Sequence, residues 1–406
     1  MAKKILYFGD SPTVATGFGV VSKEICKTLI AQGYEVEVVG LNYDGGFYDS
    51  KEFPYKIYPA IYRDGKFPYN EFIEVFKKSE FDILFTLNDV GVQDNIAVIV
   101  SSKLRDRKGF KWVAYAPIDM EYLPKEHLAP YVTTPDLVVT YTQFGRDVIR
   151  EHFPKEAQKV AIIGHGTDTE VFKPIGKEDR RKFRDNYFKL HSKDFIVVNT
   201  SRNQWRKDLF RTLDGFNRFL WTLTDKQKER AYLYLHCMPK DYMGGSLIEM
   251  VKFLNLQDRV ILPPEGFKPN DFSREQMNLV YNSADAVVSS STGEGWGLQM
   301  TEAMSCKIPV IMPDNTSHKE VLDYGNRGFL VECDGYTVAY TKNNFPRPTV
   351  NVDKLAEALR FVYGAWDGEL DKKEDVDKKV KLAYEWAVEQ SWDNVNKEWV
   401  KVLSEL

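Results

Sequence analysis

The chain has 406 residues, of which 43% are hydrophobic and 28% are charged, and its formal net charge is −4. This length is too great for one ordinary hydrophobic core and sufficient for two domains of typical size. The slightly acidic balance excludes a general attraction to nucleic acid or to an anionic membrane, and no stretch predicts a membrane span. We therefore expect a soluble globular protein with two domains.

Short apolar runs alternate with helical patterns along the whole chain, which is typical of parallel α/β layers. The first half contains expected strands at residues 5–8, 35–40, 83–87, 112–116, 137–140 and 159–163. A helix is expected from about residue 19 to 32, because Gly33 follows it as a usual C-terminal stop. The N-terminal apolar run is too short for a signal peptide, so it predicts a buried first strand.

The loop between the first strand and the first helix contains Gly17 and Gly19. It lacks the G-x-G-x-x-G dinucleotide fingerprint, because Ser22 stands where the third glycine would be. A dehydrogenase is therefore not expected.

A local basic cluster occurs before the strand at 112–116, and it consists of Lys103, Arg105, Arg107, Lys108 and Lys111. Such a cluster fits a helix C-terminus, where cations complement the helix dipole; the alternative is a contact with a membrane surface or an acidic acceptor. The four cysteines have no metal-ligand spacing. They indicate reduced thiols in a cytoplasmic protein, with no metal site.

A second series of strands is expected at residues 195–200, 231–237, 260–262, 286–289, 309–312 and 328–331. The hinge between the two series is expected near residues 165–175. After residue 353 the chain becomes helical and highly charged, and its end keeps Trp392, Trp399 and Leu403 among charges. These residues indicate a final helix with an apolar anchor.

Two cations follow the strand at 195–200 and precede a helical run. They are Arg202 and Lys207, with Arg206 as a nearby rival for either role. Strand ends in open α/β sheets face the crevice where ligands bind. A guanidinium forks across two phosphate oxygens and a lysine adds a point charge, whereas cations are unfavourable at a helix N-terminus. Phosphate binding is therefore expected in preference to two solvated charges.

Two acids, Glu294 and Glu302, stand with seven residues between them, the first in a Gly-rich loop and the second inside an expected helix. A strand, a Gly-rich turn and a helix direct backbone N–H groups and the positive helix end toward an anion. The amides expected to do so are those of Gly295, Trp296, Gly297 and Leu298. Because carboxylates accept hydrogen bonds from hydroxyl groups, this combination predicts a site for a sugar attached to a nucleotide.

The segment 289–304 resembles the E-x7-E signature of retaining glycosyltransferases, above all glycosyltransferase family 4. The resemblance continues through residues 307–311 and Glu320, and it reaches back to the two cations and to the connector at 164–174. It implies the GT-B fold, an α/β architecture in which two Rossmann-like domains face each other across a cleft. Residues 1–168 would form the acceptor domain and 169–385 the donor domain, and a last helix, about 386–406, would cross back to the first domain.

The resemblance also implies roles for single residues. Glu294 would approach hydroxyls of the transferred sugar, Glu302 would receive the ribose hydroxyls, and Arg202 and Lys207 would hold the donor diphosphate. Gly17 and Gly19 would belong to a loop that reaches toward the diphosphate, or else to a tight turn only. Gly266 and Phe267 would lie in the loop that meets the base, without distinguishing uracil from guanine.

Many family members have a histidine after the strand that corresponds to 112–116, near the transferred sugar. This chain has Pro117, Ile118 and Asp119 there. Asp119 is the nearest polar candidate, either as a contact to the sugar or acceptor or as a helix N-cap or turn residue.

The implied reaction is transfer of a sugar, with retention, from a UDP- or GDP-sugar to a hydroxyl of an unidentified acceptor such as a saccharide or a lipid-linked glycan. No cofactor and no metal are implied. Three alternatives remain: a GT-B phosphorylase or epimerase, a non-catalytic nucleotide-sugar-binding protein, and a DNA-modifying transferase. The acidic first domain does not favour the last of these.

Overall fold

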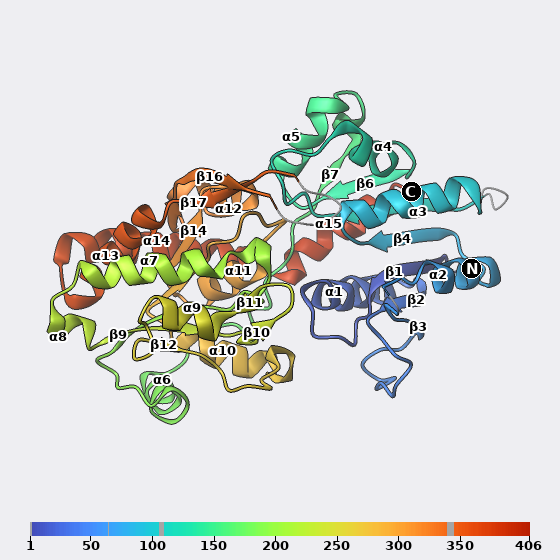
Figure 1. The fold of residues 1–406 in the computed structure, drawn as a ribbon. Helices are drawn as coiled ribbons and strands as arrows, with labels where there is room; N and C mark the ends of the chain where they lie inside the picture. Colours follow the sequence, from blue (N-terminus) through green and yellow to red (C-terminus); the bar gives the residue numbers. More distant parts are fainter. Residues whose placement is uncertain (1, 64, 105–108, 339–344) are drawn as a thin grey trace. The chain divides into compact units, whose positions relative to one another are not determined.

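The computed structural model describes residues 2–63, 65–104, 109–338 and 345–406, and the chain divides into two compact units (Figure 1). Unit 1 consists of Met1–Ile118, Leu123–Gly166 and Trp392–Leu406, and unit 2 consists of Asp119–Tyr122 and Thr167–Ser391. The sequence analysis places the end of the first domain at residue 168 and the return of the chain to that domain at about residue 386. Three members of the predicted basic cluster, Arg105, Arg107 and Lys108, lie outside the described residues.

Unit 1 is built, in the ranges described, on a seven-stranded parallel sheet with the order β3-β2-β1-β4-β5-β6-β7. Its strands are β1 (Lys4–Asp10), β2 (Glu35–Leu41), β3 (Lys56–Ala60), β4 (Ile83–Leu87), β5 (Lys111–Ala116), β6 (Leu137–Thr140) and β7 (Ala161–Ile162). Its helices are α1 (Gly17–Ala31), α2 (Tyr69–Lys78), α3 (Val90–Ser102), α4 (Lys125–Thr133), α5 (Gln143–His152) and α15 (Trp392–Ser404).

The strand β3 is absent from the sequence-based expectation. It lies at the edge of the sheet and contains Pro59, a residue that argues against a strand in a sequence pattern but is tolerated at an edge. Strand β4, in contrast, is buried along its whole length. Its continuous apolar pattern is typical of a parallel strand covered on both faces.

Helix α15 belongs to unit 1, which confirms that the C-terminal helix returns to the first domain. The ring of Trp399 lies 5.3 Å from that of Phe85 and 4.8 Å from that of Tyr115, measured between centroids. This helix begins at Trp392, not at residue 386, because the preceding helix α14 (Leu370–Glu389) extends to Glu389 within unit 2.

Unit 2 has, as far as it is described, a six-stranded parallel sheet with the order β12-β9-β8-β13-β14-β15. These strands are β8 (Phe195–Asn199), β9 (Ala231–Leu235), β12 (Val260–Ile261), β13 (Ala286–Val288), β14 (Val310–Pro313) and β15 (Phe329–Val331). The other helices of the unit are α6 (Lys177–Phe183), α7 (Leu209–Trp221), α8 (Asp225–Lys228), α9 (Leu247–Phe253), α10 (Arg274–Ser283), α11 (Leu298–Ser305), α12 (Thr316–Val321) and α13 (Val352–Asp367).

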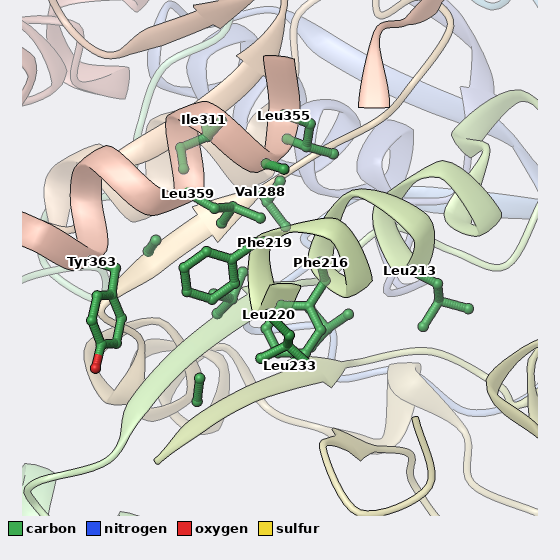
Figure 2. Close-up of a cluster of buried hydrophobic side chains, with 14 of the residues drawn as sticks. Leu213, Phe216, Phe219, Leu220, Leu233, Val288, Ile311, Leu355, Leu359 and Tyr363 are labelled. Atoms are coloured by element: carbon green, nitrogen blue, oxygen red, sulfur yellow. The ribbon is translucent and has the colours of Figure 1, made fainter. Parts of the chain in front are cut away.

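The core of unit 2 lies between its sheet and the helices α7 and α13 (Figure 2). Phe216 and Phe219 of α7 pack with Leu355 and Leu359 of α13, and all four are buried. A Cβ added at Gly215 would lie 2.6 Å from the Leu355 side chain, so this glycine allows the two helices to approach closely. The burial of each such side chain contributes about 1.5–3 kcal/mol to the stability of the fold. This core holds in place the sheet whose strand ends carry the candidate site.

Two antiparallel hairpins of unit 2 are also absent from the expectation. They are formed by β10 (Lys240–Asp241) with β11 (Gly245–Ser246), and by β16 (Cys333–Thr337) with β17 (Arg347–Val350). Neither shows a clear alternation of apolar and polar residues, which is the signal for a half-buried strand. None of the helices in the described ranges has the length and apolarity that crossing a bilayer requires.

Candidate active site

The loops that carry the predicted cations and the first predicted acid leave adjacent strands. β8 and β13 pair in parallel, with Val197 opposite Ala286 and Val198 opposite Val287. The sheet order reverses its direction between these two strands, and ligands bind outside the carboxyl ends of strands at such a switch point. The β8 loop (residues 200–208) and the β13 loop (residues 289–297) therefore emerge side by side.

Hydrogen bonds connect the two loops. The N–H of Thr292 donates to the carbonyl of Arg206 at 2.8 Å, and the hydroxyl of Ser290 donates to the carbonyl of Asp208 at 2.7 Å. The φ of Asp208 is 46°, in the left-handed region that few non-glycine residues adopt. These contacts hold the cations of the β8 loop against the acid of the β13 loop.

The buried carboxylate of Glu294 contacts two cations. Lys207 donates through Nζ to Oε1 of Glu294, and Arg206 Nη1 lies 3.3 Å from Oε2. Burial alone would raise the pKa of Glu294, but Lys207 and Arg206 outweigh it and hold this pKa well below its usual range. Burial, and then the charge of Arg206, lower the pKa of Lys207 to about 8. With one anion against two cations, the cluster has a net positive charge near neutral pH.

Arg202 stands at the exposed side of the β8 loop. Its side chain is 55% exposed, and its Nε lies 3.4 Å from the Oδ2 of Asp241, whose side chain is 1% exposed. Among the described residues no acceptor is bonded to its two Nη groups, so these groups can receive an incoming anion. The predicted rival, Arg206, is engaged with Glu294.

Glu302 lies on α11 and is linked to the start of the β8 loop through Tyr281. The hydroxyl of Tyr281 donates to Oε2 of Glu302 at 2.7 Å and lies 3.2 Å from Oγ1 of Thr200. Burial raises the pKa of Glu302 to about 7, although the Tyr281 hydrogen bond acts in the opposite direction. Glu302 is thus tied to the strand end from which Arg202 also departs.

The segment between the two acids provides backbone donors. Gly297, the N-cap of α11, has a φ of 92°, which is readily accessible to glycine. In the described part of the chain, the N–H groups of Gly295, Gly297 and Leu298 have no protein acceptor. Donors at a helix N-terminus, where the dipole is positive, favour a bound anion.

Asp119 belongs to unit 2, next to the β13 loop, although β5 before it belongs to unit 1. Both carboxylate oxygens lie 3.2 Å from Nη2 of Arg347, and its carbonyl accepts from Nη1 of Arg347 at 2.8 Å. The N-cap alternative is wrong, because α4 begins at Lys125 with Pro124 as its N-cap. A Cβ at Gly293 would lie 2.1 Å from the Asp119 carbonyl oxygen. Asp119 therefore packs against Gly293, the residue that precedes Glu294 in the chain.

The remaining predicted residues lie in two other places. Gly17 and Gly19 are in unit 1 at the start of α1, where the N–H of Gly19 donates to Oγ1 of Thr16. Gly266 has a φ of 86°, and the ring of Phe267 packs 5.1 Å from that of His236. Among the described residues no group of three or more His, Cys, Asp or Glu side chains is arranged to hold a metal ion.

Sequence reasoning missed two residues of the site. Arg347 comes from β17, a strand without a sequence signal, and it pairs with Asp119 across 228 positions of the chain. Tyr281 lies on the inner face of α10 and reads as an ordinary buried aromatic. The hydroxyl of a buried tyrosine usually has a hydrogen-bond partner. This rule was the available signal that Tyr281 contacts a polar residue.

Residues 15–171 match the family model described as Glycosyltransferase Family 4, and residues 245–338 match that described as Glycosyl transferases group 1. Together the two ranges cover more than half of the chain. The chain belongs to the glycosyltransferases. The second matched range contains the β13 loop and α11, and hence both acids.

Named relatives agree with this membership. A probable sucrose-phosphate synthase of Thermosipho melanesiensis is 26% identical over 265 residues, which are 63% of this chain and 55% of that relative. The putative glycosyltransferase EpsD of Bacillus subtilis is 24% identical over 353 residues, which are 84% of this chain and 86% of EpsD. This glycosyltransferase therefore spans about half the length of the first relative and most of the second.

The solved structure of Anabaena Alr3699/HepE in complex with UDP and glucose matches with a TM-score of 0.71 and 16% identity, covering 100% of both chains. At this identity the likeness shows the fold alone. The fold of this glycosyltransferase is GT-B, as the sequence predicted.

Proposed function

We propose that this glycosyltransferase moves a sugar from a nucleotide-diphosphate sugar to an acceptor hydroxyl, with retention at the anomeric carbon and without a resident metal. The observation that carries the proposal is the buried contact of Glu294 with Lys207 and Arg206, beside the amides of the β13 loop. A site with a net positive charge and one fixed carboxylate suits a ligand that carries both phosphates and hydroxyls.

In the proposed reaction, the bond between the anomeric carbon and the diphosphate breaks, and the electron pair leaves with the phosphate oxygen. Lys207, the Nη groups of Arg202 and the amides of Gly295, Gly297 and Leu298 would stabilise that charge without moving. The acceptor oxygen forms its bond on the same face, and its proton passes to the departing phosphate. Positioned cations of the protein would thus take the place that a metal has in other transferases.

UDP is the nucleotide to test first, because HepE has been solved with UDP and with UDP-glucose. Glu302 would accept the ribose hydroxyls, and the loop with Gly266 and Phe267 would meet the base. The acceptor is proposed only as a hydroxyl compound, such as a saccharide or a lipid-linked glycan.

The test is a screen of UDP- and GDP-sugars by thermal shift, followed by mass spectrometry of products formed with pooled saccharide and glycolipid acceptors in the presence of EDTA. We expect one donor to stabilise the protein and to give a product heavier than the acceptor by one sugar. A new nucleotide-sugar formed from the donor alone would favour an epimerase instead. Tight donor binding without any turnover would favour the non-catalytic alternative.

The proposed role of Glu302 gives a pH-dependent prediction. Because its pKa is about 7, the affinity for UDP should fall about tenfold from pH 8 to pH 6, as the carboxylate that accepts the ribose hydroxyls is protonated. Calorimetric titration at both pH values measures this, and Glu302→Gln controls for the titration of the UDP phosphate. The same fall in the variant would contradict the role.

The stability of the unliganded protein should change in the opposite sense. A raised pKa in the folded state means that the stability from neutral Glu302 is present at low pH and is lost as the pH rises through about 7. Glu302→Gln should therefore melt at a higher temperature than the parent at pH 8, and the difference should shrink at pH 6.

A further inference from the structure

Three consecutive side chains at the start of α12, residues 315–317, hold the backbone of the β13 loop. The amide of Asn315 donates to the carbonyl of Ser291 at 3.1 Å, and the N–H of Glu294 donates to Oγ1 of Thr316 at 3.0 Å. The third, a serine hydroxyl, donates to the carbonyl of Trp296 at 3.2 Å. All three side chains are completely buried, so water does not compete for these bonds.

The middle residue of this turn has an unfavourable backbone. Thr316 has a φ of 41°, and a β-branched residue in the left-handed region is a genuine outlier. Such a conformation persists only where the surrounding structure determines it, and it is frequent at functional sites. A glycine would adopt the same φ without strain, but it would lack the hydroxyl that accepts the Glu294 N–H.

The direction of that hydroxyl is fixed by its neighbours. Because the Nδ2 of Asn315 is committed to the Ser291 carbonyl, its Oδ1 faces the other way, 3.2 Å from Oγ1 of Thr316 and 3.1 Å from Nδ1 of His318. The hydroxyl hydrogen therefore goes to Oδ1, and a lone pair of Oγ1 faces the Glu294 N–H.

We propose that Thr316 is a positioning residue for the sugar donor: its hydroxyl fixes the backbone of Glu294, and thereby the carboxylate and the amides that follow it. Thr316 touches no substrate in this scheme and acts through Glu294. The inference rests on the proposed function for the role of Glu294. It adds that Thr316 of α12 fixes the backbone of Glu294, whereas Lys207 and Arg206 bind its carboxylate.

Thr316→Val keeps the shape and the β-branch but removes the acceptor, and Thr316→Ser restores it. We expect the valine variant to lower kcat for sugar transfer by about 10- to 100-fold, because a displaced Glu294 carboxylate stabilises the transition state less well. The affinity for UDP should change by less than about threefold, because the contacts to the diphosphate persist. The serine variant should recover most of kcat. Thr349→Val is the matched control, because its buried hydroxyl has no hydrogen-bond partner in the described structure.

Hydrogen exchange of the peptide covering residues 291–298 gives a second measurement that needs no donor. The Glu294 amide should exchange at least about tenfold faster in Thr316→Val than in the parent or in Thr349→Val. Unchanged exchange, or a kcat loss that serine does not rescue, would overturn the positioning role. If exchange rises as expected but the parent transfers no sugar, Thr316 still holds the backbone of Glu294, and it is the proposed function, with the role of that support in catalysis, that fails.

Discussion

Replacing Lys207 with alanine is expected to lower kcat/KM for the nucleotide-sugar donor about 100- to 1000-fold, the loss typical of removing one preorganised group that stabilises developing charge. Lys207 is held in place by Glu294 and is only 12% exposed, so it acts where water screens charge weakly. The measurement is steady-state kinetics with the donor that the screen identifies. UDP binding should weaken together with turnover, because the diphosphate is bound before and after transfer.

A lysine in an exposed ion pair provides the control. Lys111 pairs with Asp136 in unit 1 and is 53% exposed, and such surface pairs contribute roughly 0–1 kcal/mol. Lys111→Ala should leave donor kinetics within about threefold of the parent. Equal kinetic losses in both lysine variants would argue against a phosphate role for Lys207.

Glu294→Gln is expected to separate nucleotide binding from sugar transfer. The variant removes the negative charge that compensates Lys207 and Arg206, and breaking a buried pair costs about 3–5 kcal/mol of stability. The melting temperature should fall by several degrees. Turnover should fall at least about 100-fold, whereas UDP should bind as tightly as before or more tightly, because its phosphates replace the missing anion.

The control for Glu294 is Glu357→Gln, since Glu357 forms an exposed pair with Lys354 and is 65% exposed. This change should alter neither the melting temperature nor the kinetics measurably. A Glu294→Gln variant that loses UDP affinity in proportion to turnover would contradict a sugar contact.

Much of the fold follows from the sequence, because the parallel strands are buried apolar runs with helical patterns between them. The expected strands at 83–87 and 137–140 coincide with β4 and β6. The edge strand β3 and the two hairpins gave no such signal, since edges and short hairpins obtain their stability from partners that lie far away in the chain. The end of the last long helix, at Glu389, was also not predictable from a charged pattern without a strong stop.

The proximity of charged residues was predictable where they follow the ends of neighbouring strands. Lys207 and Glu294 were expected to act on one ligand, and the structure brings them into contact. The pairing of Asp119 with Arg347 and the support of Glu294 by Thr316 were not predictable, because each depends on tertiary neighbours with no fixed spacing. Thr316 in particular reads as an ordinary helix-start residue until its positive φ is seen.

The central claim is that one site holds the phosphates through Lys207 and the sugar through Glu294. Calorimetric titration of UDP and of the matching UDP-sugar, against the parent, Lys207→Ala and Glu294→Gln, tests it most directly. Lys207→Ala should weaken both ligands alike, and Glu294→Gln should abolish only the difference in affinity between them. If Glu294→Gln leaves that difference unchanged, the two residues do not act on opposite ends of one donor.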